Sequence, residues 1–174
     1  MRTCFLIFCC VFFAAIVHAE QTCKPESIPA STPDNQLIDN SDGTVTDSKT
    51  GLIWKKCVEG VSGDNCEIGT PDNFTWQKAL QQPSIINNRG GFAGHTDWRL
   101  PNINELVSLV EEQCSDPAIN LNRFPNTPSS YVWSCSPSAE VSSYVWYVYF
   151  GSGNSSDGIL RDDSYAVRMV RGGQ

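Results

Sequence analysis

The stretch Asp97-Trp98-Arg99-Leu100-Pro101-Asn102-Ile103-Asn104-Glu105-Leu106 joins an extended segment to a helix. Alternation in the extended part places the tryptophan and the first leucine on one side and Arg99 on the other. The proline cannot donate a hydrogen bond to a strand, and the asparagine after it is a favoured N-cap residue. The motif is typical of a structural joint with a tryptophan anchor. A ligand contact through Arg99 or Glu105 is the alternative.

Two short helices are predicted on either side of this joint. The first covers residues 75–82, with capping residues in the segment 71–75, and ends at Pro83. The second covers residues 103–113, because Glu105 lies at the capping-box position and apolar residues recur with helical spacing.

The remaining patterns predict strands. Asp42-Gly43 and Lys49-Thr50-Gly51 are turn signals, so we expect a hairpin of residues 44–47 against 52–55. The later β-prone runs are residues 131–134, 143–150 and 165–170, with a flexible turn over 151–158. An early hairpin and a late antiparallel sheet, connected through two helices and long loops, predict an α+β fold.

Aromatic residues are concentrated in one of these runs, residues 143–150. Alternation in a strand places Tyr144 and Trp146 on one face and Tyr147 and Tyr149 on the other. One face must fill the core. The exposed face is a candidate ligand-binding surface, since aromatic rings stack on flat apolar surfaces such as sugar rings. Packing alone is the alternative explanation of this pattern.

The first 19 residues have the pattern of a cleaved secretory signal peptide. Arg2 precedes an apolar run over residues 5–17, and the segment ends in Val17-His18-Ala19. This run is shorter than the ~20 residues that span a bilayer, and no later segment is long enough to do so. We therefore expect a secreted, periplasmic or cell-surface protein, with residues 20–36 as an extended arm and 37–174 as one domain. A retained N-terminal anchor is the alternative.

The charge balance narrows the range of partners. Cleavage after Ala19 removes one of the 12 basic residues and none of the 19 acidic ones, which leaves a formal net charge of −8. Charge of this sign repels phosphate backbones and anionic lipids, so it disfavours nucleic-acid and membrane-surface partners. One histidine, His95, then remains as a candidate base or ligand contact. We find no nucleophile motif to match it, and a position in a surface loop is the simpler explanation.

The acidic turn Asp39-Asn40-Ser41-Asp42-Gly43 invites comparison with a calcium site. An EF-hand loop with Gly43 at its sixth position would begin at Ile38, which cannot coordinate a cation. A hairpin turn that uses Asp and Gly for their backbone tolerance explains the residues better. We predict no metal and no cofactor. A calcium site of another type, with Asp34 or Asp157 as further ligands, is the alternative.

Five cysteines remain after signal cleavage, and export favours disulfides between them. Cys57 and Cys66 enclose a Gly- and Asp-rich loop that can fold back on itself, so we expect them to pair. A bond from Cys23 to Cys114 would fix the proline-rich arm to the domain. Cys135 is then the free thiol, either buried or available for an intermolecular bridge.

Several motifs together resemble the Lcl (Legionella collagen-like) C-terminal domain family, which is found in exported bacterial proteins. The resemblance covers residues 37–173, nearly the whole expected mature chain. It rests on the segments 42–47, 50–54, 75–80, 91–106, 124–128, 131–134 and 167–173 in this order.

This resemblance implies a C-type-lectin-like fold, related to that of formylglycine-generating enzymes, with a terminal hairpin that brings the chain ends together. It implies no defined active site. The adhesin that gives the family its name is associated with sulfated glycosaminoglycans, and the net charge argues against that ligand here. Because the family often has serine at position 135, the resemblance also supports Cys135 as the unpaired thiol.

The sequence as a whole favours an exported, non-catalytic binding or adhesion module with a glycan or a surface protein as its partner. A structural or assembly subunit at the cell surface is the second hypothesis. An enzyme of the formylglycine-generating type is the third, and it would need a reactive cysteine pair. The sequence leaves the oligomeric state open.

Overall fold

A computed structural model describes residues 20–173, and the predicted signal peptide lies outside them. The predicted α+β class is confirmed: two helices and small antiparallel sheets make up the described chain. The helices are α1 (Trp76–Asn88) and α2 (Ile103–Val107). The strands are β1 (Thr22–Cys23), β2 (Leu37–Asp39), β3 (Thr44–Asp47), β4 (Ile53–Lys55), β5 (Val61–Ser62), β6 (Ile68–Gly69), β7 (Cys114–Ser115), β8 (Tyr131–Pro137), β9 (Tyr144–Tyr149), β10 (Asn154–Leu160) and β11 (Val170–Arg171).

A four-stranded sheet in the order β11-β4-β3-β2 contains the predicted hairpin. Its register pairs Val45 with Trp54 and Trp54 with Val170, so three buried side chains share one face. Gly43 has φ of +85° in the turn between β2 and β3, and the ring of Phe92 lies directly over it. The sheet therefore joins β2, from the N-terminal part of the described chain, to its last strand, β11.

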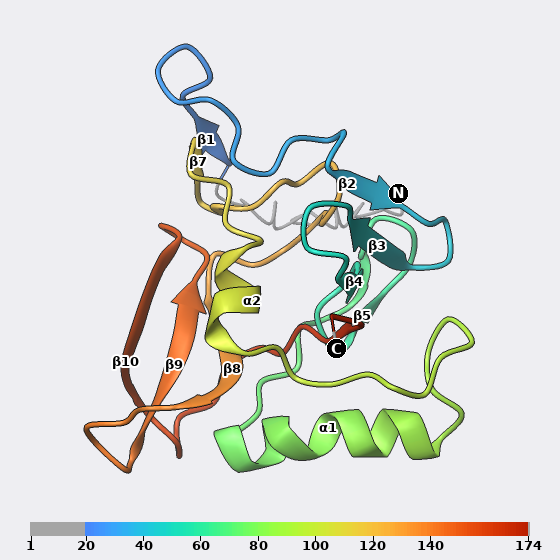
Figure 1. Cartoon of the computed structure of the whole chain (residues 1–174), viewed down its shortest axis with the longest axis vertical. Coiled ribbons are helices and arrows are strands. Elements are labelled where there is room, and N and C mark those ends of the chain that lie inside the picture. Colours follow the sequence, from blue (N-terminus) through green and yellow to red (C-terminus); the bar gives the residue numbers. More distant parts are fainter. Residues whose placement is uncertain (1–19, 174) are drawn as a thin grey trace, which may run out of the picture.

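The second large sheet has the order β10-β9-β8 and lies across α2 from the first sheet (Figure 1). The prediction of a flexible turn over residues 151–158 was wrong, because β10 begins at Asn154 and pairs antiparallel with β9. The segment has a polar, glycine-containing sequence without a strand pattern. Its strand conformation comes from hydrogen bonding to β9, and the β-propensities of its own residues do not predict this pairing.

Hydrophobic clusters cover both faces of this sheet. Val132 and Val148 belong to a first cluster with α2 and the four-stranded sheet. Trp133 and Val145 belong to a second cluster, which residues of α1 and the 92–100 segment complete. The expectation of one core face and one open face of the sheet is therefore too simple. Aromatic side chains of the sheet are accessible to solvent only beyond the edges of these two clusters.

Helix α1 runs through Pro83, so the predicted end at residue 82 was wrong. The proline leaves the carbonyl of Ala79 without its helical partner, a cost of ~3 kcal/mol in a helix interior. Contacts beyond the proline favour the longer helix. Ile86 packs on the second cluster, and the side chain of Asn87 accepts from the backbone N–H of Trp98 and donates to its carbonyl at 3.1 and 2.8 Å.

Helix α2 ends at Val107, six residues before the predicted end. Its capping box is present as expected: Asn102 accepts from the N–H of Glu105, and Glu105 accepts from the N–H of Asn102. The chain then turns because Val110 forms a bridge to Ile119. The apolar residues after position 107 therefore belong to this turn and not to the helix.

The C-terminal strand is also shorter than predicted. Residues 165–169 cross between the two sheets through single bridges from Tyr165 to Phe74 and from Ala166 to Val132. Strand β11 begins at Val170, where it pairs with β4. The run of apolar residues reflects burial along this crossing.

Two disulfides close the structure, in the pairs expected from the sequence. Cys23 is bonded to Cys114 across the β1–β7 pair, and Cys57 is bonded to Cys66 around the loop that holds β5. Neither helix of the described chain has the length and apolar character to cross a membrane.

Candidate functional site

Four tyrosines gather on one face of the β8–β9–β10 sheet and form what we call the tyrosine surface. The register pairs Tyr131 with Tyr149 and Trp133 with Tyr147, so these side chains share a face. Tyr165 reaches the same place from the crossing segment. All four tyrosines are half-buried, with part of each ring open to solvent.

Tyr131 lies at the centre of this surface. Its ring centroid is 5.2 Å from that of Tyr147, 4.7 Å from that of Tyr149 and 4.8 Å from that of Tyr165. The hydroxyls of Tyr131, Tyr147 and Tyr149 make no hydrogen bond to another residue of the 20–173 segment. Tyrosine rings fixed in this way combine apolar faces with polar tips that are free for a ligand.

A buried tryptophan supports the tyrosine surface from below. Trp133 is fully buried, and its indole N–H donates to the carbonyl of Phe74 at 2.6 Å. Tyr165 lies 5.1 Å from Trp133 between centroids, and its backbone pairs with that of Phe74. The surface is therefore anchored to the second hydrophobic cluster, which limits its conformational freedom.

Asp163 places a negative charge beside Tyr165. Burial, followed by the carboxylate of Asp163, raises the pKa of Tyr165 above its ordinary value. The phenol therefore stays protonated at neutral pH and remains a hydrogen-bond donor.

The structure separates the aromatic residues singled out in the sequence. Tyr147 and Tyr149 lie on the tyrosine surface, whereas Tyr144 and Trp146 alternate to the opposite face of β9. On that face the carbonyl of Trp146 accepts from the hydroxyl of Ser134 at 2.7 Å. The strand pattern alone could not decide which pair would be joined by Tyr131 and Tyr165.

Arg99 has a structural role. Its guanidinium donates two hydrogen bonds of 2.7 Å to Glu105 and one of 2.9 Å to the carbonyl of Gly172. Burial alone would raise the pKa of Glu105, but the bond and charge of Arg99 and the bond from the N–H of Asn102 together hold that pKa below its ordinary value. Both side chains are used to fix the joint and the chain end, as the structural interpretation predicted.

His95 lies exposed in a loop, where its backbone pairs with that of Phe92. The nearby Asp97 accepts from Arg171 at 2.8 Å, and this bond lowers the pKa of Asp97. Asp97, two residues from His95 in the sequence, is thus paired with Arg171.

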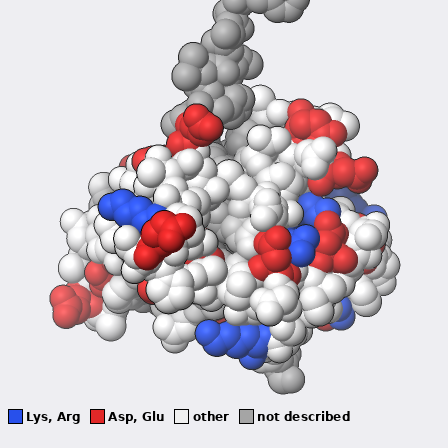
Figure 2. Space-filling view, turned by 90° about the horizontal axis from the view of Figure 1, so that it is seen from above, with Lys and Arg blue, Asp and Glu red and all other residues white. Residues whose placement is uncertain are grey.

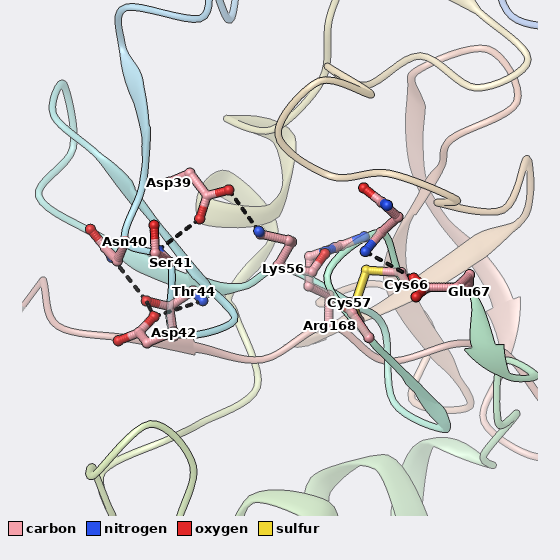
Figure 3. Close-up of polar contacts among 12 residues, drawn as sticks. Asp39, Asn40, Ser41, Asp42, Thr44, Lys56, Cys57, Cys66, Glu67 and Arg168 are labelled. Carbon is pink, nitrogen blue, oxygen red and sulfur yellow. Dashed lines mark hydrogen bonds and ion pairs between the residues drawn. A yellow bond between two sulfur atoms is a disulfide. The ribbon is translucent and has the colours of Figure 1, made fainter.

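The acidic turn is closed by bonds within the protein (Figure 3). Asp39 accepts from the ammonium group of Lys56 at 2.6 Å and from the N–H of Ser41. Asp42 accepts from the N–H and the hydroxyl of Thr44. Within residues 20–173, no group of three His, Cys, Asp or Glu side chains is arranged to hold a metal ion.

The sequence model of the Lcl C-terminal domain matches residues 43–171, which include the tyrosine surface, α1 and α2. The chain belongs to the Lcl C-terminal domain family. No curated protein matches the chain significantly. The family match begins after β2, so the Cys23–Cys114 disulfide joins the Lcl domain to a segment outside it.

Arg168, near the end of the Lcl domain, is fully buried, and sequence reasoning did not single it out. It donates to the carbonyls of Lys55 and Lys56 and to the hydroxyl of Thr127, and it lies over the ring of Phe124. Burial lowers its pKa to about 9, so the side chain is still protonated at neutral pH. Its contacts hold β4 against the 124–127 loop.

Cys135 of the Lcl domain is the free cysteine of the described chain and opens onto a groove of about 520 Å³. Leu80, Pro83 and Leu100 form apolar walls of this groove. Burial, and then the carboxylate of Glu105, raises the pKa of Cys135, which keeps the thiol protonated. A protonated thiol is a weak nucleophile.

Proposed function

We propose that the protein is an exported, non-catalytic binding or adhesion module, and that the tyrosine surface binds a sugar ring of an extracellular glycan. The observation that carries the proposal is the convergence of Tyr131, Tyr147, Tyr149 and Tyr165 on one half-exposed face. The C–H face of a sugar packs on an aromatic ring, and phenol hydroxyls bond to its hydroxyl groups.

The rigidity of the surface supports this proposal. Ordering a flexible side chain costs ~0.5–1.5 kcal/mol on binding, and rings already packed together avoid much of that cost. Trp133 and the Phe74–Tyr165 bridge fix the rings before a ligand arrives. The predicted C-type-lectin-like arrangement would suit such a role, since it is built around long loops on a small rigid core.

The charge of the chain favours a neutral or weakly charged glycan. Basic side chains on the face shown in Figure 2 stand singly or beside acidic ones and form no broad basic patch there. A densely sulfated polymer needs many closely spaced cations. We therefore do not propose the sulfated ligand associated with the adhesin of this family.

Export follows from the predicted signal peptide and agrees with the two disulfides. A formylglycine-type enzyme would need a second thiol beside Cys135, and the other cysteines of residues 20–173 are bonded in pairs. An assembly subunit is the second candidate function, since the apolar groove beside Cys135 offers a place for a partner chain.

The proposal is tested with a glycan array that is probed with the mature chain, residues 20–174, with and without calcium. Tyr147→Ser and Tyr144→Ser form a matched pair, because both residues lie on β9 but face opposite sides. We expect Tyr147→Ser to abolish the binding of every glycan that the unmodified chain retains, and Tyr144→Ser to preserve it. Thermal unfolding of both variants shows whether they are folded. Binding to no glycan in either condition would favour the assembly function.

A further inference from the structure

Arg161 is a cation beside the tyrosine surface that has no anionic partner in the described chain. It follows β10 directly, and its guanidinium carbon lies 4.5 Å from the ring centroid of Trp76, the first residue of α1. The side chain is half-buried. Stacking on an indole fixes the plane of the guanidinium and leaves its edge free to donate.

The other arginines that are not exposed are bonded. Arg99, Arg123 and Arg171 each lie within ion-pair distance of a carboxylate, and Arg168 has three acceptors. Arg161, by contrast, lies within ion-pair distance of no carboxylate among the residues described, and its Nε, like those of Arg123 and Arg168, has no hydrogen-bond partner there. A fixed guanidinium that donates no hydrogen bond to a protein acceptor is suited to bind an anionic ligand.

The same sheet face connects Arg161 to the tyrosine surface. Trp76 packs on the second hydrophobic cluster together with Tyr147 and Tyr165, and its indole N–H donates to the carbonyl of Ser134. The backbone N–H of Arg161 donates to the carbonyl of Ser143, four residues before Tyr147 on the same chain segment. Four residues of strand span about 13 Å. One sugar ring cannot contact both Arg161 and Tyr147, whereas two or three linked rings can.

Two features determine which ligand charge the site around Arg161 and Trp76 can bind. Helix α1 has no acidic residue in its first turn, so the positive end of its dipole at Trp76 is not neutralised there. Asp162 and Asp163 follow Arg161 in the chain and would repel a ligand with closely spaced negative charges. A single carboxylate flanked by neutral groups fits both features.

We propose that the glycan bound by the tyrosine surface carries an isolated carboxylate, as in a uronic acid between neutral sugars, and that Arg161 binds this carboxylate. The proposal rests on the proposed function of the tyrosine surface. The guanidinium donates two parallel N–H bonds to the two carboxylate oxygens, while the neighbouring neutral sugar packs on the tyrosine rings. Arg161 thereby selects acidic over neutral glycans of the same backbone.

The test uses a tetrasaccharide in which a neutral hexose alternates with glucuronic acid, and the same tetrasaccharide after reduction of its carboxyl groups. Dissociation constants are measured by calorimetry for the mature chain and for Arg161→Gln, Arg161→Lys and Arg89→Gln. Arg89 is an exposed arginine at the other end of α1 and serves as the control. We expect the mature chain to bind the acidic form at least tenfold more tightly than the reduced form.

Arg161→Gln should remove this preference while it leaves binding of the reduced form unchanged. Arg161→Lys should keep part of the preference, since it retains the charge but loses the paired donors, and Arg89→Gln should change nothing. Equal binding of the two forms by the mature chain, or an unchanged preference in a folded Arg161→Gln variant, would overturn the inference alone. Tighter binding of a densely sulfated polymer than of the tetrasaccharide would also overturn it. Binding of neither form would overturn it and, with an empty array, the proposed function as well.

Discussion

The ring of Tyr149 lies against the backbone of Gly151: a Cβ on Gly151 would stand 2.4 Å from Cζ of Tyr149 and 2.5 Å from its hydroxyl oxygen. Gly151 does not have a left-handed backbone, so it is the neighbouring ring that excludes a side chain here. The position of Tyr149 on the tyrosine surface thus depends on a missing side chain two residues later.

Gly151→Ala is therefore expected to push the Tyr149 ring away from Tyr131 and to weaken glycan binding at least tenfold. The overpacking should cost about 1–3 kcal/mol of unfolding free energy, measured by urea unfolding. Gly158→Ala is the control, because the nearest atom to its Cβ would be 3.7 Å away. Unchanged binding by a folded Gly151→Ala variant would show that the position of Tyr149 is unimportant.

Glu111 fixes the N-terminal arm to the domain and makes the stability dependent on pH. Its buried carboxylate accepts from the N–H groups of Ser31 and Thr32 at 2.9 and 2.8 Å. Burial alone would raise the pKa of Glu111, but these bonds, together with those from the Thr32 hydroxyl and the N–H of Gln113, lower it below the ordinary 4.5. The folded state then binds fewer protons than the unfolded state, so stability falls as the pH drops below about 4.5 through the lowered value.

We expect Glu111→Gln to cost about 1–3 kcal/mol at pH 7 and to reduce the loss of stability between pH 5 and pH 3, a range on the order of the carboxylate titration. Urea unfolding at a series of pH values measures both effects. Glu112→Gln, at an exposed neighbouring position, should behave like the unmodified chain. Identical pH profiles for the two variants would refute the anchoring role of Glu111.

The two disulfides should differ in their contribution to stability. The Cys23–Cys114 bond spans a sequence separation of 91, and the Cys57–Cys66 bond spans 9. Loop-closure entropy then gives ~4.5 kcal/mol for the first and ~2.7 kcal/mol for the second. The double variant Cys23→Ser/Cys114→Ser should consequently be less stable than Cys57→Ser/Cys66→Ser by ~2 kcal/mol in urea unfolding. The reverse order would mean that the arm contributes little to the folded domain.

Arg168→Lys should destabilise the protein by about 2–4 kcal/mol, because one ammonium group cannot reach all three acceptors of the guanidinium. Lysine also loses the planar contact with Phe124. Arg171→Lys is the comparison, since Arg171 pairs with the exposed Asp97, and we expect it to cost less than about 1 kcal/mol. Thermal and urea unfolding measure both variants. Equal effects would indicate that the buried bonds of Arg168 are dispensable.

Local signals in the sequence predicted those parts of the fold that depend on near neighbours. The turn signal Lys49-Thr50-Gly51 predicted the β3–β4 hairpin, and the spacing of Asn102 and Glu105 predicted the capping box. Helix ends were predicted less well, since contacts distant in sequence decided them: Asn87 with Trp98 past Pro83, and Val110 with Ile119 past α2.

The candidate site depends on the register of strand pairing, which a local sequence pattern does not predict. Tyr147 and Tyr149 were singled out correctly as members of one face, but Tyr131 and Tyr165 join them through the β8–β9 pairing and the crossing segment. Arg161 lies between the predicted turn over residues 151–158 and the predicted strand from residue 165, and its stacking on Trp76 follows from the pairing of β10.

The measurement that tests the central claim most directly is an NMR titration of the mature chain, with labelled tyrosine rings, against a glycan taken from the array. The chain has five tyrosines, of which four form the tyrosine surface and Tyr144 faces the other side of β9. The ring signals of Tyr131, Tyr147, Tyr149 and Tyr165 should shift together with one dissociation constant, while that of Tyr144 stays in place. A saturating glycan that moves Tyr144 and leaves the other four unchanged would contradict the account.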